Sequence, residues 1–213
     1  MSQANDRPQR PPIPPPQNNL ARAVEMGFDA LDAQSVEQLL WLGAERSAAT
    51  WRVAVLDEMI EVDPSARRVV TSAGREVGPP WAILVLHYLA VSSRPERCEP
   101  ETTFADLATA RSYAGIYQGR VITRLCYTAG RDAETLCTAA ERLQGRRIDT
   151  GDAAFDFDVF PRLSLRLIWH APDDEFPPSA TLLLPGNIES YFCSEDIVVL
   201  SESLVARLSG RPF

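Results

Sequence analysis

The clearest alternation of apolar and polar residues in the chain runs from Asp152 to His170 and predicts a β-hairpin. Side chains of a strand alternate between its two faces, so each half of this segment divides into two sets. In the first half, the polar face carries Asp152, Asp156 and Asp158, and the apolar face carries Ala153, Phe155, Phe157 and Val159. In the second half, Leu163, Leu165, Leu167 and Trp169 share one face, and Ser164, Arg166, Ile168 and His170 share the other.

The register of this hairpin decides whether both apolar faces reach the same core. A two-residue loop at Pro161-Arg162 would place the aspartates opposite the leucines, because a shift of one residue exchanges the faces of a strand. A loop with an odd number of residues would instead place Arg166 beside Asp156 or Asp158. We therefore predict an odd loop, with the carboxylates and Arg166 together on the more hydrated side of the sheet.

Helical patterns fill much of the remaining chain. Residues 81–91 are apolar on every side and predict a buried helix that begins after Pro80. Asp132 can cap a second helix, and Ser194 is expected to cap a third near the C-terminus. The other helical patterns cover residues 19–48, with a break near Gly27 or Asp32, and residues 113–127.

Shorter patterns predict strands at residues 51–62, 67–71 and 181–184. Helices and strands do not alternate strictly, so we expect an α+β fold with a mixed or antiparallel sheet, in which the hairpin packs against several helices. A length of 213 residues fits one domain, which we place at residues 19–213. Residues 1–18 are rich in proline and are expected to form a disordered tail.

The charged residues narrow the classes of function. The net charge is -8, and an acidic protein repels nucleic acids and anionic membrane surfaces. All 21 basic residues are arginine, which excludes Schiff-base lysines, pyridoxal-phosphate anchors and phosphate-loop lysines. The chain also contains no Gly-x-Ser-x-Gly, Gly-x-Gly-x-x-Gly or His-Glu-x-x-His motif, so nucleophile-elbow hydrolases, dinucleotide-binding proteins and zincins have no support.

Three features indicate the compartment. The N-terminus has no apolar run of signal-peptide length, and the longest apolar stretch, Trp81 to Leu86, is too short to cross a bilayer. The four cysteines form no Cys-x-x-Cys pair. We therefore expect a cytoplasmic protein that spans no membrane and carries free thiols.

One candidate site is the acidic turn after the hairpin. His170, Asp173, Asp174 and Glu175 follow one another closely, and carboxylates with an imidazole can hold a divalent cation. A solvated turn beside two prolines explains the same residues without a ligand. With two histidines in the whole chain, we assign no metal site. A pair drawn from Asp156, Asp158, Asp173 and Glu175 could also serve glycoside hydrolysis, or simply form ion pairs on the sheet.

His87 is the other candidate. It lies within the apolar helix at residues 81–91, where a histidine commonly bonds to a carbonyl group in the core. It could alternatively serve as an axial ligand, a proton carrier or a substrate contact. Trp81 and Tyr88 nearby would suit a flat ligand, although aromatic residues at helical spacing also pack in ordinary cores.

Six short segments in a fixed order carry a resemblance to a known family. They are Trp81–Leu89, Gly151-Asp152, Phe160-Pro161-Arg162, Ile168-Trp169, Asp174–Ala180 and Glu195-Asp196. In this series the chain resembles the bacterial and archaeal DUF3786 family, a domain of unknown function, over residues 80–205. Such proteins are often built with, or encoded near, a four-cysteine iron–sulfur module like that of corrinoid iron–sulfur proteins.

The resemblance implies corrinoid or one-carbon redox chemistry. Residues 1–80 contain no cysteine, so an iron–sulfur or corrinoid centre would belong to a protein partner. We expect an accessory binding protein that engages such a cofactor or partner in a cleft beside the hairpin and the turn from Asp173 to Ser179. The expected cofactor-binding residues are His87, Trp169, His170, Asp174 and Glu175.

Two other functions fit the same sequence. A carboxylate- or metal-dependent hydrolase could use the same acidic surface. A structural subunit could dock a larger complex through its proline-rich tail and its apolar N-terminal helix. The patterns leave the identity of the cofactor and the oligomeric state open.

Overall fold

The computed structural model describes residues 19–108, 110 and 113–213, so the proline-rich tail expected at residues 1–18 lies outside the described part. The helices are α1 (Leu20–Asp32), α2 (Val36–Trp41), α3 (Pro79–Leu89), α4 (Ala114–Tyr117), α5 (Arg124–Tyr127), α6 (Ala133–Arg142) and α7 (Ser194–Leu208). A π-helical segment, η3 (Gln118–Thr123), joins α4 to α5, and short 3-10 turns form η1 (Phe104–Asp106) and η4 (Ile188–Ser190).

The strands of the described residues form two antiparallel sheets. The first is a meander of β1 (Glu45–Ser47), β2 (Thr50–Val55), β3 (Glu58–Asp63) and β4 (Arg68–Thr71). The second has the order β5-β9-β8-β7-β6 and comprises β5 (Pro100–Thr103), β6 (Arg146–Ile148), β7 (Ala153–Phe160), β8 (Leu163–His170) and β9 (Ser179–Pro185). This arrangement confirms the predicted α+β fold with an antiparallel sheet.

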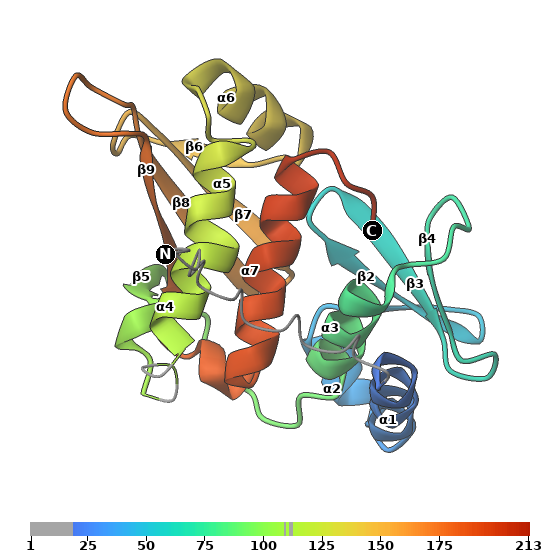
Figure 1. Ribbon diagram of the computed structural model, residues 1–213. Helices are drawn as coiled ribbons and strands as arrows, with labels where there is room; N and C mark the ends of the chain where they lie inside the picture. The colour runs from blue at the N-terminus through green and yellow to red at the C-terminus, as the bar shows by residue number, and fades with distance from the viewer. Residues whose placement is uncertain (1–18, 109, 111–112) are drawn as a thin grey trace, which may run out of the picture.

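The helices cover one side of the second sheet and link it to the first. In Figure 1, α7 and the α4–η3–α5 helix lie side by side across the second sheet, and α6 lies beside β7. Helix α3 packs against both α1 and α7, and β2 contacts β7. One apolar cluster connects these layers, with Phe28, Val53, Leu84, Phe157 and Leu204 among its buried members.

In the hairpin β7–β8, Asp156 lies opposite Arg166, which is one of the two predicted pairings. The expected odd loop is wrong. Phe160 pairs with Leu163, so the turn has two residues, and the register shifts at a bulge between Asp158 and Phe160. A bulge adds one residue to one strand, so it restores the parity that an odd loop would have supplied. Asp156 is buried rather than hydrated, whereas Asp158 on the same face is exposed.

Two expected elements divide where local geometry interrupts the pattern. Residues 19–48 form α1, α2 and β1, because the chain leaves the helix at Asp32 and Ser35 then caps α2 by accepting a hydrogen bond from the Gln38 N–H at 3.2 Å. Residues 51–62 form the hairpin β2–β3 rather than one strand. Its turn places Leu56 at φ 53°, and the Leu-Asp sequence lacks the usual Asn-Gly signal of such turns.

Within the described residues, no helix has both the length and the apolar character needed to cross a bilayer. All four cysteines, Cys98, Cys126, Cys137 and Cys193, are free thiols.

Candidate functional site

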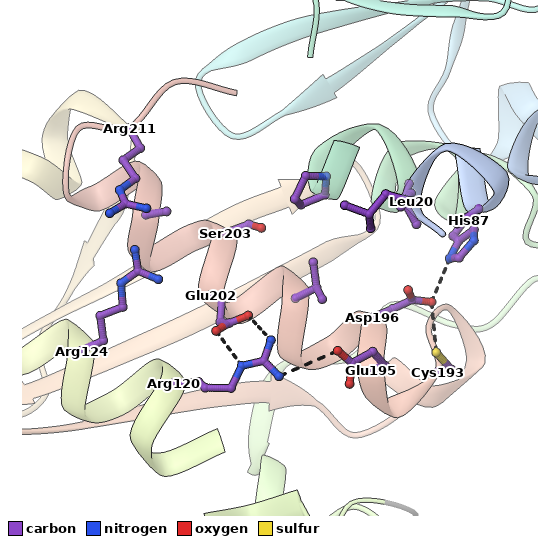
Figure 2. Close-up of a pocket in the computed structure, with 15 residues that line it drawn as sticks. Leu20, His87, Arg120, Arg124, Cys193, Glu195, Asp196, Glu202, Ser203 and Arg211 are labelled. Atoms are coloured by element: carbon purple, nitrogen blue, oxygen red, sulfur yellow. Dashed lines mark hydrogen bonds and ion pairs between the residues drawn. The ribbon is translucent and has the colours of Figure 1, made fainter. Parts of the chain in front are cut away.

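A cleft of about 540 Å³ opens between α1 and α3 on one side and α7 with the η3–α5 helix on the other. This volume lies in the range of small-molecule sites. Its apolar lining comes from Leu20 and Ala23 of α1, Ile83 of α3, and Val199 and Ala206 of α7. Figure 2 shows polar side chains at both ends of this lining. The ion pair of Arg120 with Glu202 lies between the two ends.

Helix α3 reaches the cleft through the one stripe of its surface that is not buried. Pro80, Ile83 and His87 line the cleft and recur at a spacing of three and four residues, which places them on one face. The other faces of α3 carry the buried residues Trp81, Ala82, Leu84, Val85, Leu86, Tyr88 and Leu89. The side chain of His87 is 35% exposed, so it is not the core histidine that its apolar neighbours suggested.

Helix α7 divides in the same way. Its residues Glu195, Asp196, Val199, Glu202 and Ala206 line the cleft, while an opposite face that includes Ile197, Leu200, Leu204 and Leu208 is buried. The helix begins at Ser194, and its N-cap position is Cys193 rather than Ser194 as expected. This start places Cys193 and Asp196 at the same end of the cleft (Figure 2).

At that end, two side chains bond to one carboxylate oxygen. His87 Nδ1 lies 2.9 Å from Asp196 Oδ2, and Cys193 Sγ lies 3.3 Å from the same oxygen. The hydrogen bond to Asp196 raises the pKa of His87. Burial opposes ionisation of Asp196, but its hydrogen bonds and the charge of His87 outweigh burial and lower the pKa of the carboxyl group.

These protonation states define what His87 can do. An ionised carboxylate only accepts hydrogen bonds, so Nδ1 of His87 carries the hydrogen and donates this hydrogen bond to Asp196. The neutral ring therefore presents a lone pair at Nε2, the arrangement found in histidines that ligate metals or accept protons. Partial burial and the charge of Asp196 raise the pKa of the Cys193 thiol, so this thiol is not activated as a nucleophile.

Three arginines also line the cleft. Arg120 makes a two-point contact with Glu202, with Nε–Oε1 at 2.8 Å and Nη2–Oε2 at 2.6 Å, and lies 3.8 Å from Glu195. Arg124 and Arg211 lie at the end of the cleft away from His87 (Figure 2). Neither of these two side chains has an ion-pair partner within the described part of the chain.

The structure does not bring the five expected site residues together. His87 lines the cleft, but Trp169 is 1% exposed and its indole N–H donates to the Gly130 carbonyl oxygen at 2.7 Å. This placement corrects the expectation that Trp169 contacts a ligand. The cause is strand parity, which directs Trp169 into the core and His170 to the opposite face.

His170, Asp174 and Glu175 are exposed at the end of β8 and in the turn that follows it. Asp173 organises this turn, because its Oδ1 accepts hydrogen bonds from the backbone N–H groups of Glu175 and Phe176 at 2.9 and 2.7 Å. The acidic turn therefore has a local structural explanation. Among the described residues, no three histidine, cysteine or acidic side chains are grouped as a metal site.

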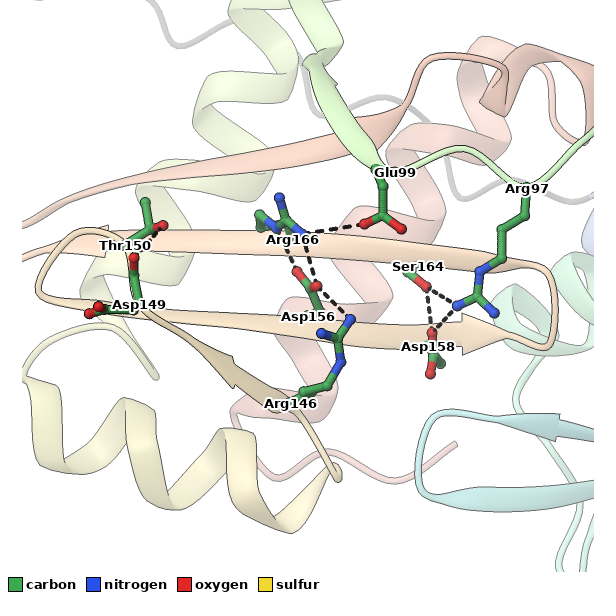
Figure 3. A network of polar contacts seen from close by, with 9 residues as sticks. All are labelled: Arg97, Glu99, Arg146, Asp149, Thr150, Asp156, Asp158, Ser164 and Arg166. Atoms are coloured by element: carbon green, nitrogen blue, oxygen red, sulfur yellow. Dashed lines mark hydrogen bonds and ion pairs between the residues drawn. The ribbon is translucent and has the colours of Figure 1, made fainter.

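The carboxylates of the hairpin form ion pairs on the sheet (Figure 3). Asp156 accepts hydrogen bonds from Arg166 at 2.7 and 3.0 Å and from Arg146 at 2.8 Å. Asp158 accepts from Ser164 and from Arg97. Both aspartates therefore act as partners of arginines, which is the structural alternative to a catalytic carboxylate pair.

The sequence did not indicate Cys193, Asp196 or the three arginines as site residues. One usable signal was the stripe of Pro80, Ile83 and His87 on an otherwise apolar helix. The segments opposite that stripe follow more than thirty residues later, so their approach depends on the whole fold.

Comparison with known proteins gives a family and no function. No curated protein and no solved structure matches the chain. The model of one family, the domain of unknown function DUF3786, matches residues 37–207, which extends the expected resemblance toward the N-terminus. Because this match covers most of the chain and confirms the resemblance, the chain belongs to the DUF3786 family.

Proposed function

We propose that the chain is an accessory binding protein whose cleft engages a corrinoid-type cofactor, or a protein partner that carries one, in cytoplasmic one-carbon or redox metabolism. The observation that carries this proposal is the His87–Asp196 pair beside an apolar cleft. Two segments that underlie the family resemblance, the helix at residues 81–89 and Glu195-Asp196, meet at this pair. The free thiols support a reducing compartment.

The pair fits the role of a ligand to a metal that a bound cofactor would carry. A histidine that ligates a metal commonly donates its other ring N–H to a carboxylate, as His87 does to Asp196. A whole corrinoid is larger than a cleft of about 540 Å³, so the cleft would hold only part of such a cofactor. When bound, a corrinoid supplies the exchange of a ligand at its cobalt, and His87 would hold that metal through Nε2.

The alternative of a carboxylate- or metal-dependent hydrolase has its best support at the same cleft. The His87–Asp196 pair could accept a proton from water, whereas the acidic turn after β8 is solvent-exposed. A Cys–His nucleophile has less support, because Cys193 bonds to Asp196 rather than to His87. A structural subunit is favoured by the exposed apolar side chains of Met26, Val36 and Leu40 on α1 and α2.

The test uses cobinamide, a corrinoid that lacks its own nucleotide base and so has an axial position free for imidazole. The chain has two histidines, which makes His170→Ala a matched control for His87→Ala. We expect the protein and its H170A variant to shift the absorbance band of cobinamide, and H87A to leave it unchanged. Asp196→Asn should weaken binding by about 10-fold or more, as loss of a supporting carboxylate does at metal-binding histidines.

Three outcomes would reject this proposal. An unshifted spectrum with the unmodified protein would remove the cofactor assignment. An equal loss in H87A and H170A would show that the effect does not depend on the cleft. If cobinamide does not bind but the protein associates as its concentration rises, the structural-subunit alternative takes its place.

A further inference from the structure

The end of the cleft away from His87 is cationic in a chain whose net charge is -8. Figure 2 shows the guanidinium groups of Arg124 and Arg211 at this end, one from α5 and the other from the segment after α7. Among the other arginines, Arg120, Arg166 and Arg207 each have a carboxylate partner. Within the described residues, Arg124 and Arg211 have no such partner although the chain holds more carboxylates than arginines.

The backbone holds Arg211 in place. Gly210 has φ 84° and ends α7, and the N–H of Arg211 donates to the Ala206 carbonyl oxygen at 3.0 Å while the N–H of Gly210 donates to that of Arg207 at 2.9 Å. This is a Schellman motif. Arg207 in turn bonds to the carbonyl oxygen of Arg211 at 3.0 Å and to Asp57 at 2.7 Å. Both backbone polar groups of Arg211 are therefore fixed at the cleft.

Arg124 is also held by a defined element. It follows the π-helical segment η3 directly, and its carbonyl oxygen accepts a hydrogen bond from Thr128 Oγ1 at 2.7 Å. Single π-helical turns occur frequently at functional sites, because the wider turn changes the direction of the side chains that follow it. The two arginines thus reach the cleft from separate elements with their backbones already ordered.

We propose that Arg124 and Arg211 form an anion subsite and that the ligand of the cleft is an organic molecule with an apolar body and a phosphate group. Guanidinium groups bind phosphate oxygens through paired hydrogen bonds, and two of them can neutralise its two charges. The apolar body would lie on Ile83, Val199 and Ala206, between this subsite and His87. This inference rests on the proposed function, since it names the ligand class of the same cleft.

The test uses phenyl phosphate as the probe, with inorganic phosphate and benzoate for comparison, measured by calorimetry at low and high salt. Phenyl phosphate should bind more tightly than inorganic phosphate, because its ring covers the apolar lining. Arg124→Ala and Arg211→Ala should each weaken the binding of phenyl phosphate by about 10-fold, which agrees with the usual free-energy contribution of a hydrogen bond to a charged group. Arg147→Ala is the matched control, since Arg147 is an exposed arginine of β6 that does not line the cleft.

Each result has one meaning. Absence of phosphate binding, or equal losses in R147A and in the two cleft variants, overturns the subsite. Benzoate binding as tightly as phenyl phosphate overturns the assignment of a phosphate group and leaves a carboxylate ligand. If R124A and R211A still shift the absorbance band of cobinamide through His87 while no phosphate binds, the subsite is rejected and the proposed function is kept. Circular dichroism of R124A and R211A confirms that each variant is folded before its affinity is compared.

Discussion

Replacing Asp156 by alanine should destabilise the protein far more than the same change at Asp158. The two aspartates lie two residues apart on one face of β7, so the change in strand propensity is similar in both variants. Their surroundings differ, because the side chain of Asp156 is 2% exposed and that of Asp158 is 67% exposed. Asp156 accepts three hydrogen bonds from Arg146 and Arg166, whereas Asp158 accepts one each from Arg97 and Ser164.

The magnitude follows from what each deletion leaves behind. Removing one partner of a buried ion pair costs about 3–5 kcal/mol when the other charge stays buried. Here Arg146 is 67% exposed and Arg166 is 24% exposed and lies 3.5 Å from Glu99, so both regain solvent or a partner. We therefore expect Asp156→Ala to lower the free energy of unfolding by about 2–3 kcal/mol. For Asp158→Ala we expect about 0.5–1 kcal/mol, the range of exposed ion pairs.

Urea unfolding followed by circular dichroism measures both values. The midpoint should fall in each variant while the slope of unfolding free energy against urea stays constant, since the surface exposed on unfolding is unchanged. A loss below about 1 kcal/mol in D156A, or equal losses in the two variants, would refute the argument that burial of this ion pair decides its contribution.

Two further predictions test the cleft and the packing of the sheet. An NMR titration should place the pKa of His87 above its ordinary value, and Asp196→Asn should lower that pKa. The pair should stabilise the fold most between pH 3.8 and pH 6.5. The contribution of His87 is lost as pH rises through its raised pKa, and that of Asp196 is lost as pH falls through its lowered pKa. An unchanged His87 pKa in D196N would contradict this. Gly43→Ala should lower the free energy of unfolding by at least about 2 kcal/mol, because Gly43 has φ 85° and an added Cβ would lie 2.5 Å from Pro161 Cβ. Gly115 has open space around it, so Gly115→Ala should be neutral or slightly stabilising. Equal melting temperatures of the two variants would contradict this contrast.

The sequence predicted the parts of the fold that depend on neighbours along the chain. Face alternation predicted that Arg166 would lie beside Asp156 or Asp158, and the structure pairs it with Asp156. Asp132 caps α6 as predicted, with its Oδ1 accepting from the Thr135 N–H at 2.7 Å. The bulge after Asp158 and the turn at Leu56 were missed, since neither carries a glycine or asparagine signal.

The candidate site was harder to predict for two physical reasons. The acidic turn after β8 looked like a ligand site, but Asp173 satisfies the backbone of that turn by local hydrogen bonds that any turn of this composition can form. His87 was identified as a candidate, but the sequence fitted a histidine bonded in the core as well as one that contacts a ligand. Its partner Asp196 lies 109 positions away, so their contact depends on how α3 packs against α7.

The position of the cleft also connects binding with folding. Leu20 begins the first helix and Arg211 lies two residues from the C-terminal Phe213, yet both line the same cleft. The cleft is therefore complete only when α1 and the segment after α7 have both docked on the helices between them. A ligand that binds only this folded arrangement stabilises it by about 2.7 kcal/mol at a concentration of about 100 times its Kd. Because the lining spans both ends of the described chain, that stabilisation would act on the fold as a whole rather than on one element.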